Sequence, residues 1–130
     1  MRHLKNVCAV IKNEVGEVFV CKRKPEGENA SKWEFPTDKL RDGISIEMDA
    51  VRVVFEKLKT MVYPERIITC VDYTNKEVER PYNVVLQVVE CKVVKGKLVL
   101  DEYVDSKWVK VEDLNSLDLV NEDKEVIASL

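Results

Sequence analysis

The stretch KWEFPTDKLRDGISIEMDAVRVVFEKLKTMV, residues 32–62, carries the pattern that decides the fold. From Ser45 to about Met61, apolar residues recur at intervals of three and four, which is the spacing of an amphipathic helix. Ser45 stands where an N-cap is expected, because its hydroxyl can accept a hydrogen bond from an early helical N–H. We therefore expect one long helix, whose inward face is formed by Val51, Val54, Leu58 and Met61.

Strand patterns surround this helix on both sides. Residues 3–23 alternate apolar and polar side chains and break near Gly16, which predicts a β-hairpin, and the polar residues 24–31 predict an exposed loop. Further strands are expected downstream, with a turn near Gly96 and a short terminal helix over residues 120–130. The expected strands are RIITCVDY (66–73), NVVLQVVECKVV (83–94), KLVL (97–100) and KWVKV (107–111). This order predicts one α/β domain, a mixed sheet with the long helix on one side and the terminal helix on the other.

Length and charge exclude several classes of protein. A chain of 130 residues is long enough for one domain with its own core, and 45% hydrophobic with 35% charged residues is typical of an ordered globular protein. The net charge of −3, without a dense basic run, argues against binding to duplex nucleic acid. No apolar run has membrane-spanning length and the start lacks the features of a signal peptide, so we expect a cytoplasmic protein without membrane association. Isolated cysteines within apolar runs are expected to be reduced core residues: Cys8, Cys21, Cys70 and Cys91.

The order of these motifs resembles the Nudix superfamily, and most closely its MutT-type nucleoside triphosphate pyrophosphohydrolases. The resemblance rests on VFVCKR (18–23), WEFP (33–36), a helix entered after a single glycine, a strand ending in Trp108, and the final segment VNEDKEVIASL (120–130). It implies a single Nudix-type α/β/α sandwich over residues 1–130. It also implies cleavage of a nucleoside triphosphate between its α and β phosphates, with Mg²⁺ held by glutamates on the long helix.

The signature of that family is only partly present on the helix. Of its defining positions, only Arg52, Val54 and Glu56 carry the expected residue types. The signature has glycine at the positions of Asp38 and Lys59 and glutamate at those of Ile44, Val53 and Lys57. It has an aliphatic residue at the position of Thr60. Arg52 and Glu56 are therefore the remaining candidate catalytic residues, and catalysis is expected to be lost or strongly impaired.

Helical spacing explains what these replacements change. Positions 53, 56, 57 and 60 are expected to share one helix face, so glutamates there would converge on one metal ion. Mg²⁺ requires oxygen ligands, whereas Val53 offers none and Lys57 repels a cation. In one interpretation, Lys57 pairs directly with a phosphate and a nucleotide binds without being cut. In the other, Glu56 and Lys57 are solvated charges, and Arg52 with Glu56 forms an ordinary i,i+4 ion pair.

Other candidate binding residues follow from the resemblance. Arg23 and Asn121 match residues that contact the nucleotide, and Glu102 matches an acid that supplies a further metal ligand or base. Alternatively, Arg23 is a solvated charge on a strand, Asn121 is a helix N-cap, and Glu102 is a charge on a loop. Phe35, like Tyr73 and Tyr82, could stack on a base, although aromatic residues in strands are more often core residues, as expected for Trp33 and Trp108.

Three functions therefore remain open from the sequence. The first is a Nudix domain with impaired catalysis that still binds a nucleoside triphosphate or a related nucleotide. The second is an active Mg²⁺-dependent pyrophosphohydrolase that uses a different set of carboxylates, with Glu56 and Glu102 as metal ligands beside Asp38 and Asp42. The third is an interaction protein without a small ligand. Mg²⁺ is the implied cofactor in the second case, and no cofactor is implied in the third.

Overall fold

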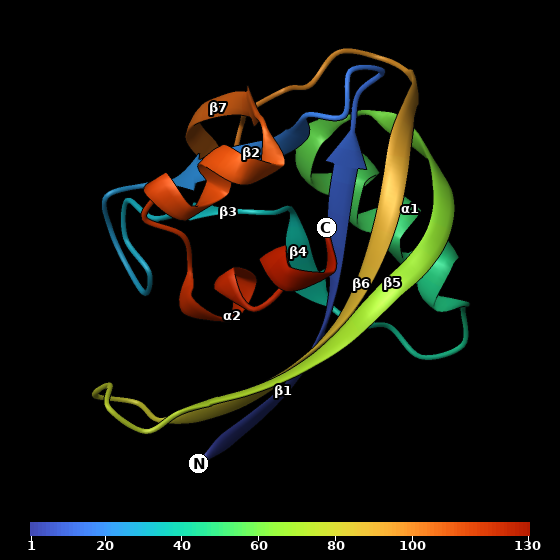
Figure 1. The fold of residues 1–130 in the computed structure, drawn as a ribbon. Helices are drawn as coiled ribbons and strands as arrows, with labels where there is room; N and C mark the ends of the chain where they lie inside the picture. Colours follow the sequence, from blue (N-terminus) through green and yellow to red (C-terminus); the bar gives the residue numbers. More distant parts are fainter.

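The computed structural model describes residues 1–130, which form one seven-stranded mixed sheet covered on both faces (Figure 1). Its main path runs β3-β2-β1-β6-β5, while β4 pairs with β1 and β7 pairs with β2. Strands β1 and β6 are parallel and the other pairs are antiparallel. The strands are β1 (Arg2–Lys12), β2 (Val18–Arg23), β3 (Trp33–Glu34), β4 (Thr37–Lys39), β5 (Met61–Asn75), β6 (Tyr82–Lys95) and β7 (Tyr103–Val109).

The expected N-terminal hairpin is confirmed, because β1 and β2 pair antiparallel with Lys12 opposite Val18. The turn between them depends on two residues. The side-chain oxygen of Asn13 accepts hydrogen bonds from the backbone N–H groups of Val15 and Glu17. Gly16 adopts a φ of 83°, a conformation that glycine reaches without steric cost.

The long helix α1 spans Ile46–Leu58, and Ser45 caps it as expected by accepting from the N–H of Met48 at 3.2 Å. It ends before Met61, which instead begins β5 and is exposed. The reason is Lys59, which takes the left-handed conformation at φ 55° and closes the helix with a bond from its N–H to the carbonyl of Phe55.

Two apolar layers hold the sandwich together. One lies between α1 and the sheet and includes Ile11, Phe19, Val53 and Leu58. The other lies on the opposite face, under three short helical segments, and includes Val10, Phe35, Leu86, Leu114 and Leu119. The segments are η1 (Val111–Ser116), α2 (Asn121–Lys124) and η2 (Ile127–Ser129). The predicted α/β/α arrangement is confirmed, although the terminal helix is only one turn long and is followed by a separate 3₁₀ turn.

Several expectations were wrong in detail. Residues 97–100 are not a strand, because the chain crosses there from Gly96 toward β7 and Val99 N–H bonds the carbonyl of Leu58. Cys70 is exposed, whereas burial raises the thiol pKa of the other three cysteines, which are core residues as expected. Trp33 and Trp108 are only partly buried at the edges of the two layers. None of the helices has the length and apolar character needed to cross a membrane.

The conformation of Lys59 predicts that glycine at position 59 is more stable than alanine. A non-glycine residue at positive φ carries a steric cost of about 1 kcal/mol. Because Lys59→Ala and Lys59→Gly both remove the bond from Lys59 Nζ to the Glu56 carbonyl, their difference isolates the backbone effect. We expect Lys59→Gly to be more stable than Lys59→Ala by about 1 kcal/mol in urea unfolding. Equal stability would show that the left-handed conformation carries no strain.

Candidate functional site

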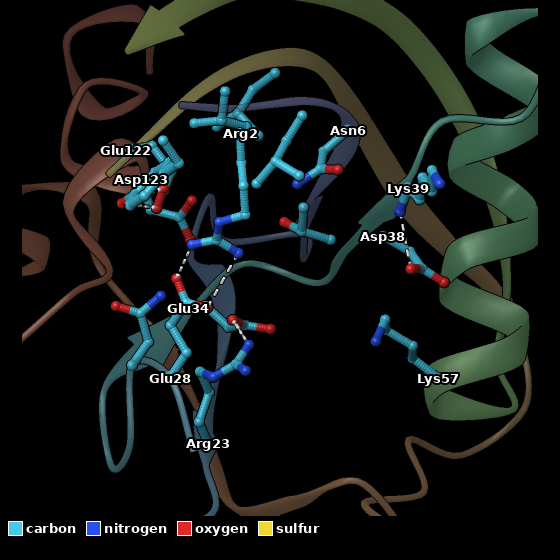
Figure 2. Close-up of a pocket in the computed structure, with 16 residues that line it drawn as sticks. Arg2, Asn6, Arg23, Glu28, Glu34, Asp38, Lys39, Lys57, Glu122 and Asp123 are labelled. Atoms are coloured by element: carbon cyan, nitrogen blue, oxygen red, sulfur yellow. Dashed lines mark hydrogen bonds and ion pairs between the residues drawn. The ribbon is translucent and has the colours of Figure 1, made fainter. Parts of the chain in front are cut away.

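A cleft of about 390 Å³ opens between the start of β1, the β2–β3 loop, α1 and α2 (Figure 2). One wall is apolar and formed by Leu4 together with Val84, Leu86 and the ring of Tyr82. The rest is polar and carries both signs of charge. The charged lining residues are Arg2, Arg23, Glu28, Glu34, Asp38, Lys39, Lys57, Glu122 and Asp123.

A second hollow of about 280 Å³ adjoins this cleft. The two share Arg23, Glu34 and Lys57, so these side chains stand at the junction between them. The second hollow is lined almost entirely by charged groups, among them Lys24 and Glu102. The region thus combines an apolar wall at one end with charges of both signs at the other, where Arg23, Lys24 and Lys57 are accompanied by Glu26, Glu34 and Glu102.

Arg23 was predicted from the sequence, and the structure places it at this junction. Its guanidinium donates to Glu34 Oε1 at 2.9 Å, and the hydroxyl of Tyr103 donates to Glu34 Oε2 at 3.0 Å. Burial lowers the pKa of Arg23, but the bond and charge of Glu34 outweigh it and the net pKa is raised. Burial, with the nearby Cys21 and Glu34, also raises the pKa of Tyr103. Both groups therefore keep their protons, and Arg23 is a fixed positive charge.

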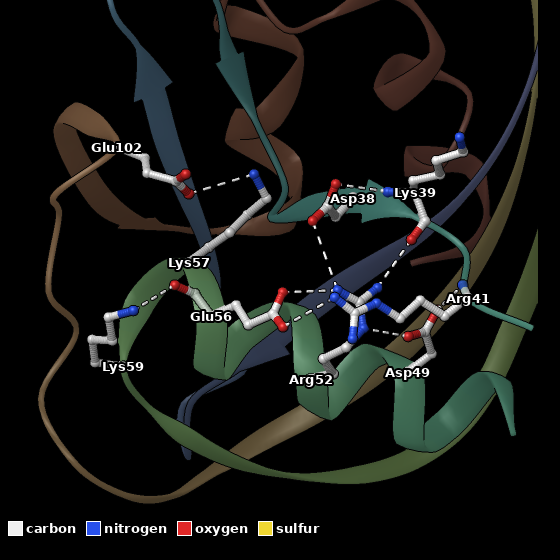
Figure 3. A network of polar contacts seen from close by, with 9 residues as sticks. All are labelled: Asp38, Lys39, Arg41, Asp49, Arg52, Glu56, Lys57, Lys59 and Glu102. Carbon is white, nitrogen blue, oxygen red and sulfur yellow. Dashed lines mark hydrogen bonds and ion pairs between the residues drawn. The ribbon is translucent and has the colours of Figure 1, made fainter. Parts of the chain in front are cut away.

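Arg52 is the centre of a polar network on the helix surface (Figure 3). Its Nε lies 2.6 Å from Oδ1 of Asp49, which is fully buried, and another nitrogen donates to the carbonyl of Lys39 at 2.9 Å. Asp49 also accepts from the backbone N–H of Arg41 at 3.0 Å. The bond to Asp49 raises the pKa of Arg52. Arg52 thus ties α1 to β4 and the loop between them, which is a structural role.

Glu56 belongs to the same network. Its carboxylate accepts from Arg52 at 2.9 Å and lies 3.5 Å from a guanidinium nitrogen of Arg41. The i,i+4 pair of Arg52 and Glu56, one of the two interpretations from the sequence, is present in the structure. The carboxylate of Asp38 is also directed at Arg52, at 3.7 Å. Two of the candidate carboxylates therefore face guanidinium groups.

The other signature positions of the helix do not converge as the spacing predicted. Val53 is fully buried in the apolar layer under α1. Thr60 lies beyond the end of the helix, buried, with its hydroxyl donating to the carbonyls of Leu58 and Lys97. Glu56 is exposed on the outer surface, with 44% of its side chain accessible. The expectation of one shared face over positions 53 to 60 was therefore wrong for Val53 and Thr60.

Lys57 is the signature position that reaches the junction of the two hollows. Its Nζ lies 3.5 Å from Oε2 of Glu102, which comes from the loop before β7 (Figure 3). Glu102 was expected as a metal ligand or a loop charge, and here it is the counter-ion of Lys57. Because 55% of the Glu102 side chain is exposed, this pair is weak and can be exchanged.

The residues at the family's magnesium positions do not fit a magnesium ion. Val53 supplies no oxygen, Lys57 brings a positive charge, and Glu56 is engaged by two arginines. Asp42 lies exposed on the entry loop and forms no ion pair that would bring it to the other acids. No three His, Cys, Asp or Glu side chains come together in a way that could hold a metal ion.

Two other candidate residues lie elsewhere than expected. Phe35 is fully buried in the second apolar layer, so its expected stacking on a base was wrong. Tyr82 lines the cleft, with the guanidinium of Arg2 over its ring at 5.7 Å from the ring centre. Asn121 is the first residue of α2, whose N-cap is Val120, so the N-cap interpretation was also wrong. Asn121 faces a neighbouring hollow that it shares with Glu28 and Tyr82, not the main cleft.

The cleft is faced instead by Glu122 and Asp123, neither of which stood out in the sequence. Glu122 accepts from the hydroxyl of Tyr82, at 3.1 Å to each oxygen. Asp123 accepts from the backbone N–H of Phe35 at 3.0 Å. Burial raises the pKa of both carboxyls. In the sequence these acids stand in a charged run, NEDKE, which is typical of a solvated surface.

The layered arrangement of the sheet and helices is that of the Nudix fold. The family model described as the NUDIX domain matches residues 2–130, and the chain belongs to this family. No curated protein sequence matches the chain at a significant level.

Solved structures share this fold at low sequence identity. A MutT protein from Methanosarcina mazei Go1 is 24% identical with a TM-score of 0.80, over 98% of this chain and 91% of that chain. A MutT NUDIX hydrolase from Burkholderia pseudomallei is 18% identical with a TM-score of 0.78, over 100% and 99%. The NUDIX domain of Shewanella oneidensis NrtR, complexed with ADP ribose, is 17% identical with a TM-score of 0.71, over 99% and 86%.

The buried ion pair predicts a large effect on stability. Arg52→Met keeps the length of the side chain but leaves the fully buried carboxylate of Asp49 without its charged partner. Orphaning a buried charge costs about 3 kcal/mol or more, which urea unfolding would detect. Arg41→Met removes only an exposed guanidinium, so we expect its effect to stay below about 0.5 kcal/mol. Similar effects of the two substitutions would contradict the structural role of Arg52.

Proposed function

We propose that this Nudix domain binds a nucleoside di- or triphosphate without a metal ion and does not hydrolyse it. The observation that carries the proposal is the position of Lys57, whose ammonium group lies at the junction of the two hollows against the exchangeable carboxylate of Glu102. A phosphate group can replace that carboxylate as the partner of Lys57, since lysine binds phosphate as a point charge.

Electrostatics favours an anion over a cation at this point. A unit charge 4 Å from the ammonium group interacts with it by about 4 kcal/mol near a protein surface, so a divalent cation there would be strongly repelled. Arg23 lines the same two hollows as Lys57 and keeps its charge because of Glu34. A diphosphate at the junction would therefore meet two cationic side chains from different elements, β2 and α1.

The shape of the cleft supports a nucleoside at the other end. The apolar wall of Leu4, Val84 and Leu86 offers a surface for the flat face of a base, next to the Tyr82 ring that the guanidinium of Arg2 covers. The related NUDIX domain that is complexed with ADP ribose shows that this fold can accommodate an adenine nucleotide derivative. The polar groups between wall and junction leave room for hydrogen bonds to a sugar.

The first prediction separates binding from turnover. Calorimetric titration with nucleoside di- and triphosphates in the presence of EDTA should give saturable binding, and added Mg²⁺ should not strengthen it. In parallel, incubation with Mg²⁺ or Mn²⁺ should release neither pyrophosphate nor phosphate. Turnover that is lost in Glu56→Gln would instead establish the active enzyme with a different carboxylate set. Absence of both binding and turnover would favour an interaction protein.

A second prediction concerns the phosphate partner. Because a hydrogen bond to a charged group contributes about 1.5–3 kcal/mol, Lys57→Ala should weaken nucleotide binding by about tenfold or more. Glu102→Gln should strengthen binding, since it removes the competing carboxylate. Lys95→Ala, on an exposed lysine at the end of β6 that lines neither hollow, is the matched control for net charge and should bind as the wild type does. An equal loss in Lys57→Ala and Lys95→Ala would refute the role of Lys57.

A further inference from the structure

A β-bulge between β2 and β7 brings Tyr103 opposite Arg23. Along β2, Lys22 pairs with Asp105, whereas the next residue pairs with Tyr103. Val104 is therefore an extra residue without a partner on β2, and it is exposed. Residues directly opposite each other in an antiparallel pair share one face of the sheet, and a regular ladder would place Val104 opposite Arg23. The bulge thus puts the phenol of Tyr103 on the face that carries Arg23.

Glu34 reaches the same face from the other side of β2. On β3 it lies opposite Cys21, which is two residues before Arg23 and therefore shares its face. Only 5% of Glu34 is exposed, and its two carboxylate oxygens have different partners. Nη1 of Arg23 donates to Oε1 at 2.9 Å, and the hydroxyl of Tyr103 donates to Oε2 at 3.0 Å. Three strands thus supply one chain of hydrogen bonds, from Tyr103 through Glu34 to Arg23.

The rest of the Arg23 guanidinium is available to a ligand. Nη1 is its only nitrogen that bonds a protein group, and 40% of the side chain is exposed where the two hollows meet (Figure 2). A guanidinium is a planar fork, so a bond at one nitrogen restricts the directions of the remaining N–H groups. Because Tyr103 holds the second oxygen of Glu34, the carboxylate cannot rotate about its last bond without losing a partner. The orientation of Arg23 therefore depends on a residue that it does not bond.

We propose that Tyr103 is a positioning residue for phosphate recognition: through Glu34 it directs the free N–H groups of Arg23 at the diphosphate of the bound nucleotide. The proposal rests on the proposed nucleotide binding and adds a residue one hydrogen bond beyond the group that contacts the ligand. An arginine that is already oriented in the free protein loses less conformational freedom on binding. Without the hydroxyl, Glu34 and Arg23 gain alternative orientations, so nucleotide affinity should fall.

The first test is a double-mutant cycle measured with adenosine diphosphate in EDTA. Tyr103→Phe removes only the hydroxyl and should weaken binding by about three- to tenfold, the effect of one hydrogen bond. In the Arg23→Ala background the same substitution should have no further effect, because the group that it positions is absent. A loss of the same size in both backgrounds would overturn the proposal, since Tyr103 would then act on the ligand directly or through the fold.

Tyr82→Phe is the matched control. It also removes a hydroxyl that donates to a buried carboxylate of the cleft, that of Glu122. Tyr82 forms no hydrogen bond with Glu34 or Arg23, so any effect of Tyr82→Phe on binding should be the same in the wild-type and Arg23→Ala backgrounds. Coupling of equal size between Arg23 and each of the two tyrosines would contradict a specific role for Tyr103.

A measurement without ligand tests the positioning itself. The NMR order parameter of the Arg23 Nε–H bond reports motion on the picosecond to nanosecond timescale, and a value below about 0.6 indicates a flexible group. We expect a value above this limit in the wild type and in Tyr82→Phe, and a value below it in Tyr103→Phe. The Arg23 signal is assigned by its absence in Arg23→Ala. The same value in Tyr103→Phe as in the wild type would overturn the proposal.

Glu34→Gln provides the same test if Tyr103→Phe does not fold. The amide keeps the shape of the carboxylate, but its NH₂ group cannot accept from Tyr103 or Arg23. Glu34→Gln should therefore increase the motion of Arg23 and weaken the binding of adenosine diphosphate, and the effect on binding should again vanish in the Arg23→Ala background. Wild-type affinity together with a wild-type order parameter would refute the role of the hydrogen-bond chain.

The outcomes of the two proposals are distinguishable. Binding of adenosine diphosphate that is unchanged in Tyr103→Phe would overturn the role of Tyr103 and leave the proposed function standing. Absence of binding by the wild type would overturn the proposed function, and the role of Tyr103 in phosphate recognition would fall with it.

Discussion

The ion pair between Asp49 and Arg52 is the constraint on which the position of the site depends. A fully buried carboxylate near the start of α1 requires a compensating charge, and Arg52 provides it one turn further along the same helix. Arg52 also holds the carbonyl of Lys39 and faces Asp38, so the helix and β4 are fixed to each other. Because Lys57 is carried on this helix, the same interaction fixes where its ammonium group meets the two hollows.

The pair also determines what the acidic residues of this region can do. The guanidinium of Arg52 is the shared partner of three carboxylates, those of Asp38, Asp49 and Glu56. The cleft beyond the helix differs, because three of its acids, Glu34, Glu122 and Asp123, are buried, and burial raises the pKa of Glu122 and Asp123. The site therefore has Arg23 and Lys57 at the junction of the two hollows and an apolar wall with two buried acids, Glu122 and Asp123, deeper in the cleft.

The sequence predicted the sandwich, the hairpin and the start of the helix, because these follow from periodicity and local turn chemistry. Ser45 and Gly16 act only on residues close to them in the chain. The failures involve contacts between distant residues. The burial of Phe35 depends on helical segments more than seventy residues further along the chain, and the partner of Lys57 is forty-five residues away.

The same distinction applies to the candidate site. Arg23 and Lys57 could be proposed from motif positions, and both line the cleft. Asp49 and Asp123 could not be singled out, because an acid in a charged segment looks the same whether solvent or protein surrounds it. Only the fold shows that Asp49 pairs with Arg52 and that Asp123 accepts a hydrogen bond from the backbone N–H of Phe35.

The burial of Val53 restricts how a metal site could arise in this domain. A carboxylate placed at position 53 would enter a sealed apolar layer shared with Phe19 and Leu58, where an unpaired charge is strongly unfavourable. Replacement of Lys57 by an acid would in addition place a second carboxylate next to that of Glu102. The step at position 53 is therefore destabilising before a metal ion can compensate, so a magnesium site here cannot begin with that substitution alone.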